Sequence, residues 1–260
     1  MVFATYVAAV AGIFAVSGVA IVALVSAYPD VPEQTLLHSL PALLAGSVAA
    51  STALLLTIVL VVRPLEPGPL RLRPGWESGR ALGMMVIGIL ALGQSLDSAT
   101  TLAGLGERSA MATIRSVLQR AAGADLFGAV LVIGVLAGTA EEIFFRGYMQ
   151  TRLRQRWPAP RAIAATSVCF SILHVDPSGI HVVLAFALSV YLGFVAELTG
   201  SALPAIVCHV VNNVVYTLQT ALGGTITDPR TNVLLAIGCG ALFVAVISWL
   251  RTARPPATAA

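Results

Sequence analysis

The chain has 260 residues, of which 57% are hydrophobic and only 10% are charged, with a formal net charge of +3 at pH 7. Because a soluble domain usually carries about 25% charged residues, this composition excludes an ordinary water-facing surface and indicates a protein surrounded by lipid. Every basic side chain is an arginine. We interpret this as the compositional bias of a GC-rich bacterial genome and not as a sign of nucleic-acid binding.

Apolar segments recur along the chain, and a membrane-spanning helix requires about 20 such residues. We expect about eight spans, at approximately 3–28, 36–62, 81–104, 124–150, 160–175, 179–198, 201–222 and 231–250. The fifth is short, and the first is too long for the apolar part of a signal peptide. The predicted fold is therefore all-α, a polytopic transmembrane helix bundle that forms a single integral membrane domain over residues 1–260.

The arginines predict how the bundle is oriented, because cytoplasmic loops of membrane proteins are enriched in basic residues. With eight spans, three arginine-rich regions and the N-terminus fall on one side, which we expect to face the cytoplasm of a bacterial cell. The regions hold Arg63, Arg71, Arg73 and Arg80, then Arg152, Arg154, Arg156 and Arg161, then Arg251 and Arg254. The connection 105–123, with Arg108, Arg115 and Arg120, falls on the other side and is a candidate interfacial helix.

Ionisable residues inside the spans are informative, because a charge at bilayer depth costs about 2.5 kcal/mol or more. Some lie close to predicted helix ends and have simple explanations. We interpret Asp97 and Glu197 as residues of solvated helix ends, and His38 and His181 as interfacial residues. The three cysteines, Cys169, Cys208 and Cys239, are odd in number and lack CxxC spacing, so we expect buried packing residues.

The remaining polar residues form three clusters on three predicted helices, and residues four apart share a helix face. In EEIFFR, Glu142 and Arg146 can pair, which leaves Glu141 free. FSILH presents Phe170 and His174, and HVVNN presents His209 and Asn213. Each polar residue alone could serve as an interhelical hydrogen bond. Together they place a carboxylate, two imidazoles and an amide in one broad layer of the bundle.

This set of groups suits the hydrolysis of an amide bond. A Glu and a His can activate a water molecule, and a His with an Asn can stabilise the developing oxyanion. The residues Glu141, His174 and His209 could instead hold Zn²⁺ with water in the open position. The spacing of these residues along the chain does not distinguish the metal-free mechanism from the zinc-dependent one. The sequence contains no HExxH, GxSxG, GxGD or P-loop motif, which argues against other hydrolase classes.

The ordered trio EEIFFRG, FSILH and HVVNN resembles the CaaX-protease and bacteriocin-processing family (CPBP, also called Abi), whose pattern is EExxxR, FxxxH and HxxxN. The resemblance covers about residues 125–220, the expected catalytic core. It implies an intramembrane endopeptidase whose site opens toward the cytoplasm. Glu141 would be the general base, assisted by His174. His209 and Asn213 would form the oxyanion site, with Glu142, Arg146 and Phe170 in support.

The resemblance leaves the metal and the substrate open, since the family has been described both as metalloproteases and as metal-free glutamate proteases. We favour a mechanism without metal or other cofactor. We expect a peptide or protein substrate at the membrane. The resemblance implies that this substrate could be prenylated, because eukaryotic members of the family cut prenylated CaaX tails. The alternatives are a proton-coupled transporter or channel, with Glu and His as a relay, and a catalytically silent scaffold. Asn213 favours the protease, because a relay needs groups that titrate.

Overall fold

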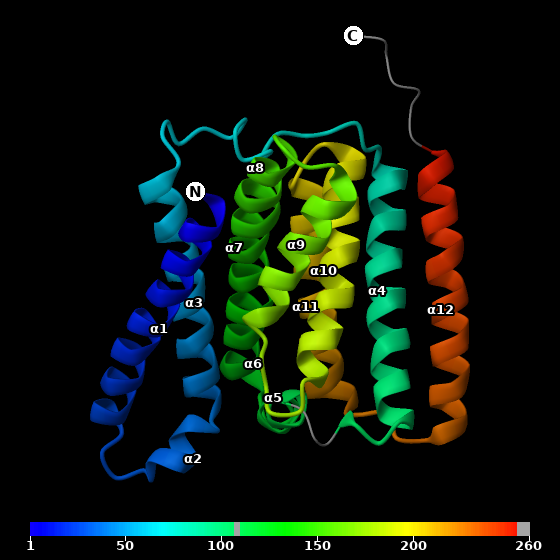
Figure 1. Cartoon of the computed structure of the whole chain (residues 1–260). Coiled ribbons are helices and arrows are strands. Elements are labelled where there is room, and N and C mark those ends of the chain that lie inside the picture. The colour runs from blue at the N-terminus through cyan, green and yellow to red at the C-terminus, as the bar shows by residue number, and fades with distance from the viewer. Residues whose placement is uncertain (107–109, 254–260) are drawn as a thin grey trace.

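The computed structural model describes residues 1–106 and 110–253, and these residues form a bundle of helices (Figure 1). The predicted all-α, polytopic fold is confirmed. Seven helical stretches are long and apolar enough to cross a membrane. They are α1 (Val2–Ala27), α3 (Leu40–Val61), α4 (Gly79–Leu102), the compound stretch Gly123–Arg154, α10 (Ile180–Thr199), α11 (Leu203–Gly223) and α12 (Pro229–Thr252).

The fifth predicted span is a shorter helix, α9 (Ala159–Ile172), of 14 residues. At 1.5 Å per residue it is about 21 Å long, which is less than the roughly 30 Å of a hydrocarbon core. Pro158 precedes its first residue, and the DPSG turn follows it closely. The expectation of about eight full spans is therefore corrected to seven candidate spans and one shorter helix within the described residues.

Local sequence signals explain where several helices begin and end. Side chains of Ser39, Ser78 and Asp228 accept hydrogen bonds from the first backbone amides of α3, α4 and α12, as expected of N-cap residues. Gly179 and Gly200 have φ angles of 70° and 74° at the two ends of α10, and glycine takes such left-handed conformations without steric cost.

The two ends of the bundle differ in composition. The start of α1, the connection 62–78, the turn between α8 (Thr151–Arg154) and α9, and the end of α12 lie at one end (Figure 1). We call it the arginine-rich end. The short helices α2 (Glu33–Leu37) and α5 (Ala110–Leu118) lie at the opposite end, which we call the α5 end. The predicted helix after residue 105 is thus present, whereas Arg108 and Arg254 lie outside the described residues.

The stretch Gly123–Arg154 contains two π-helical segments. It consists of α6 (Gly123–Ala129), η2 (Val130–Ala137), α7 (Gly138–Glu142), η3 (Ile143–Gln150) and α8. A Cβ atom at Gly134 would lie 2.6 Å from Val214 Cγ2, and one at Gly138 would lie 3.3 Å from the Val210 amide nitrogen. The glycines therefore let this stretch approach α11 closely, as small residues do between membrane helices.

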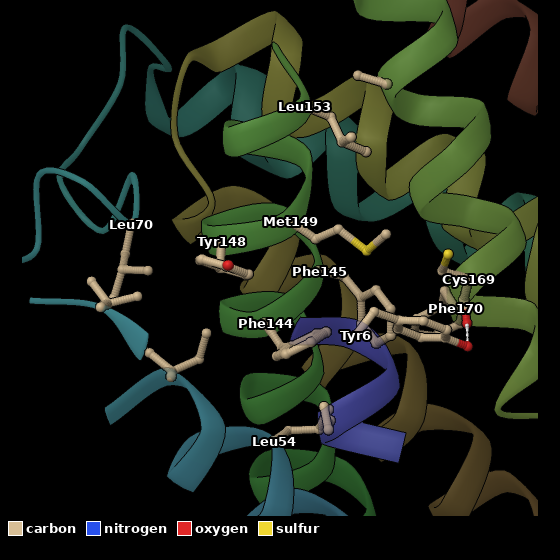
Figure 2. Close-up of a cluster of buried hydrophobic side chains, with 14 of the residues drawn as sticks. Tyr6, Leu54, Leu70, Phe144, Phe145, Tyr148, Met149, Leu153, Cys169 and Phe170 are labelled. Atoms are coloured by element: carbon tan, nitrogen blue, oxygen red, sulfur yellow. Dashed lines mark hydrogen bonds between the residues drawn. The ribbon is translucent and has the colours of Figure 1, made fainter. Parts of the chain in front are cut away.

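Aromatic residues of η3 form much of one apolar core (Figure 2). Phe144 and Phe145 are fully buried, and Phe145 meets Phe170 of α9 with ring centroids 5.2 Å apart. The Tyr6 hydroxyl of α1 donates to the Cys169 carbonyl at 2.8 Å. This cluster holds α1 and α9 against η3. Cys169, Cys208 and Cys239 are free thiols, and Cys169 and Cys208 are buried as predicted, whereas Cys239 is only partly buried.

Candidate active site

A buried ion pair stands at the centre of the site. The Arg146 guanidinium lies 2.6 Å from the Glu142 carboxylate, and both side chains are fully buried. Arg146 also donates to the Ser189 hydroxyl at 2.7 Å and to the Ser189 carbonyl oxygen at 2.8 Å. The predicted pair between Glu142 and Arg146 is therefore present, and it joins the fourth span to α10.

His209 of α11 bridges the two adjacent carboxylates. Its Nδ1 lies 2.8 Å from Glu142 Oε1, and its Nε2 lies 3.8 Å from Glu141 Oε2. A carboxylate only accepts hydrogen bonds, so Nδ1 of His209 carries the donated proton when Glu142 is ionised. The glycine contacts between the fourth span and α11 bring these groups together.

Glu141 differs from Glu142 in its surroundings. Its side chain is 20% exposed, against 0% for Glu142. Glu141 lines a cavity of about 480 Å³, together with His174, His209 and Asn213. The prediction that Glu141 stands outside the ion pair agrees with this geometry, and the cavity is where a reacting molecule could meet its carboxylate.

Phe170 and His174 form the wall of the site on the α9 side. The rings of Phe170 and His174 stack with their centroids 4.7 Å apart. The Arg146 guanidinium carbon lies 5.1 Å from the centroid of the same Phe170 ring. His174 Nδ1 lies 3.0 Å from the Phe170 carbonyl oxygen. Since a carbonyl cannot donate, Nδ1 bears the proton in this contact and Nε2 of a neutral His174 keeps its lone pair.

Asn213 lies one helical turn beyond His209. Its amide nitrogen donates to the Ile133 carbonyl of η2 at 3.2 Å, and its oxygen accepts from Asn212 at 3.4 Å. The amide group has two N–H bonds, so one contact with Ile133 leaves the second N–H for another acceptor. The four predicted catalytic residues thus line one cavity.

The zinc alternative requires Glu141, His174 and His209 to converge. Within residues 1–106 and 110–253, no group of three or more His, Cys, Asp or Glu is arranged to hold a metal ion. His209 Nδ1 is engaged by Glu142, and His174 Nδ1 by a backbone carbonyl. These contacts leave Nε2 as the ring nitrogen that each histidine could offer to a metal, but the three residues as placed here are not grouped closely enough to hold one.

Two predicted roles outside the site need correction. Glu197 is not part of a solvated helix end, because it accepts from Arg71, Gln150 and Arg154 at 2.7–3.0 Å. Asp97 does lie near the end of α4, but it pairs with Arg115 of α5. In both cases a distant arginine supplies the partner, and helical spacing cannot reveal such a partner.

Other functional positions had weak or no sequence signals. His181 lines the cavity, with its ring centroid 5.0 Å from that of His174, although its place at the start of a span suggested an interfacial residue. Ser189 sits among apolar residues of α10, and nothing in the sequence links it to Arg146. His38 is exposed, which agrees with its predicted interfacial place.

Fold and site together define a class: a polytopic helical membrane protein with paired carboxylates, histidines and an asparagine around an internal cavity. Residues 123–215 match the family model described as type II CAAX prenyl endopeptidase Rce1-like. This stretch of the chain, which holds all three motifs, is thus similar to a family of CAAX-type membrane proteases, in agreement with the resemblance to CPBP proteins. Neither curated proteins nor solved structures gave a match.

Proposed function

We propose that this protein is an intramembrane endopeptidase that uses Glu141 to activate water against a peptide bond of a membrane-associated or prenylated substrate. One observation carries the assignment. Of two adjacent carboxylates, Glu142 is fully buried and held by Arg146 and His209, whereas Glu141 faces the cavity beside His209. The carboxylate paired with Arg146 fixes the helix, and the carboxylate outside that pair is available as a base.

The proposed reaction begins with a water molecule that donates one hydrogen bond to Glu141 and another to the lone pair of His174 Nε2. Glu141 takes a proton from the water as its oxygen bonds to the scissile carbonyl carbon. The tetrahedral intermediate then collapses, the C–N bond breaks, and Glu141 returns the proton to the leaving amine. The products are a carboxylic acid and an amine, which at neutral pH become a carboxylate and an ammonium group, and Glu141 regains its initial ionised form.

His209 and Asn213 would stabilise the oxyanion of that intermediate. The free N–H of the Asn213 amide is one donor. His209 becomes a second donor when Nε2 carries a proton in addition to Nδ1, and the Glu142 carboxylate beside Nδ1, together with the oxyanion itself, balances the resulting charge. Preorganised donors of this kind act strongly in a site that excludes bulk water.

The oxyanion role separates the protease from the proton-coupled transporter. An asparagine amide does not titrate, so Asn213 fits a donor site and not a relay. The family match of residues 123–215 also favours the protease. We further propose that the bundle sits in a bacterial cell membrane with both termini in the cytoplasm, because the start of α1 and the end of α12 lie at the arginine-rich end.

The test is a cleavage assay with purified protein on a panel of membrane-associated peptides, with and without a prenyl group. The Glu141→Gln variant keeps the shape of the side chain and removes the base, so kcat/KM should fall by about 10²–10⁴. Glu66→Gln changes the same residue type at an exposed position of the connection 62–78 and should retain activity. Unchanged cleavage by Glu141→Gln would remove Glu141 from the proposed mechanism.

A further inference from the structure

Two adjacent asparagines of α11 contact different walls of the cavity. The Asn213 amide nitrogen donates to the Ile133 carbonyl of η2 at 3.2 Å. Asn212 instead reaches α4, which packs against α11. There, a Cβ atom built on Gly93 would lie 2.9 Å from Asn212 Oδ1. These four residues line the cavity together with Glu141, so the two asparagines connect the fourth span to α4 beside the site.

A hydrogen bond joins the two asparagine side chains. The Asn212 amide nitrogen donates to Asn213 Oδ1 at 3.4 Å. Each carboxamide has one end that donates and one end that accepts, so the contacts determine the direction of both groups. The Ile133 carbonyl only accepts, which turns the Asn213 nitrogen toward η2. The Asn213 oxygen then faces Asn212, which must present its nitrogen to that oxygen and its own oxygen to α4.

The direction of the Asn213 carboxamide matters for the oxyanion site. A rotation of about 180° about χ2 exchanges the oxygen and the nitrogen of an asparagine, and both orientations are sterically allowed. The reversed orientation would place the Asn213 oxygen against the Ile133 carbonyl and the Asn213 nitrogen against the Asn212 nitrogen. It would also turn the oxyanion donor away. The hydrogen bond from Asn212 therefore favours the productive orientation before the reaction begins, which is the preorganisation that an oxyanion site requires.

Gly93 of α4 leaves the space that the Asn212 carboxamide occupies. A separation of 2.9 Å between a Cβ atom and Asn212 Oδ1 is too short for van der Waals contact, so an alanine at this position would displace the carboxamide. The displaced atom is the end of a flexible side chain, and the packing of α4 against α11 can otherwise be kept. Gly93 lies outside residues 123–215, which match the family model. Through Asn212, a helix outside that stretch thus contacts the site.

We infer that Asn212 is a positioning residue of the oxyanion site, which Gly93 accommodates and which acts through Asn213. This inference rests on the proposed function and extends the oxyanion site to α4. Asn212 fixes the direction of the Asn213 carboxamide, and Asn213 donates to the oxyanion. Because the oxyanion forms only during the reaction, loss of this positioning should lower kcat and leave KM nearly unchanged.

The kinetic test uses the peptide of the panel that the wild type cleaves fastest. Asn212→Leu keeps the approximate size of the side chain and removes the donor, so kcat should fall about 2–10-fold, the effect of one net hydrogen bond. Gly93→Ala should lower kcat to a similar extent. Neither change should add to the loss in Asn213→Ala, because both act through that carboxamide. The matched control Gln219→Leu removes an exposed carboxamide about two turns further along α11 and should leave kcat unchanged.

A second measurement detects the contact without proteolysis. The chain has three asparagines, Asn212, Asn213 and Asn232, so ¹⁵N labelling of asparagine side chains gives an NMR spectrum of three NH₂ groups in detergent. Asn232 of α12 donates to the Ile226 carbonyl at 2.8 Å and serves as the reference for a folded protein. Asn212→Leu should remove one NH₂ group and shift that of Asn213. Gly93→Ala should shift the NH₂ groups of Asn212 and Asn213 and leave that of Asn232 in place.

Two results would overturn the inference. One is an Asn213 NH₂ group that keeps its position in both Asn212→Leu and Gly93→Ala. The other is a wild-type kcat in these two variants, or a loss that multiplies with that of Asn213→Ala. Both results differ from a failure of the proposed function, in which Glu141→Gln would still cleave the peptide.

Discussion

Removal of either partner of the ion pair between Glu142 and Arg146 should destabilise the protein far more than removal of Glu141. Both partners are fully buried, and Glu142 also accepts from His209. Breaking one partner of a buried pair costs about 3–5 kcal/mol, because the remaining charge is left without compensation. At about 2–4 °C per kcal/mol for a chain of this size, Glu142→Ala or Arg146→Ala should lower Tm by roughly 6–20 °C.

The matched comparison is Glu141→Ala, which removes the neighbouring carboxylate. Its side chain is 20% exposed, and its contact with His209 spans 3.8 Å, which is too long for a direct hydrogen bond. We expect a Tm within about 3 °C of the wild type, corresponding to about 1 kcal/mol or less, together with loss of cleavage. Thermal unfolding in one detergent, followed by tryptophan fluorescence, would measure all three variants.

The double variant Glu142→Ala/Arg146→Met sharpens the test. Glu142 Oε2 and Arg146 Nε have no hydrogen-bond partner among the described residues, and apolar replacement of a whole buried pair is often close to neutral. The double variant should therefore be more stable than either single variant. Equal Tm losses for Glu141→Ala, Glu142→Ala and Arg146→Ala, or strictly additive losses in the double variant, would refute the separation of a structural and a catalytic carboxylate.

Three further predictions concern the oxyanion site, the metal and the loop after α9. Asn213→Ala should lower kcat by about 10²–10³ with little change in Tm, in steady-state kinetics of the folded variant. Purified active protein should contain no stoichiometric zinc and keep its activity after chelation and dialysis. Loss of zinc and activity together, restored by added zinc, would instead assign Glu141, His174 and His209 as ligands. The hydrogen bond from the Ser178 hydroxyl, with further help from the Ala110 amide, lowers the pKa of Asp176. Its charged form therefore stabilises the fold above the ordinary aspartate pKa, and this stability is lost as the pH falls through the lowered value. The Tm difference between wild type and Asp176→Asn should be present at pH 7 and should vanish in strong acid, and a difference that persists there would contradict this role.

The sequence alone predicted the helical bundle, because long apolar segments can satisfy their backbone in lipid only as helices or closed barrels. Spacing along single helices also predicted the pair of Glu142 and Arg146 and put His209 and Asn213 on one helix face. Only the tertiary structure decided which residues of different helices meet. Ser189 contacts Arg146 from α10, and Glu197 meets Arg71, which lies in a connection 126 positions away. The contacts of the connection 62–78 with the ends of α10 and α11 depend on the path of that connection over the bundle. The periodicity of a sequence shows which residues share one face of one helix. The path of the connection 62–78 is instead set by packing between segments that are distant in the chain.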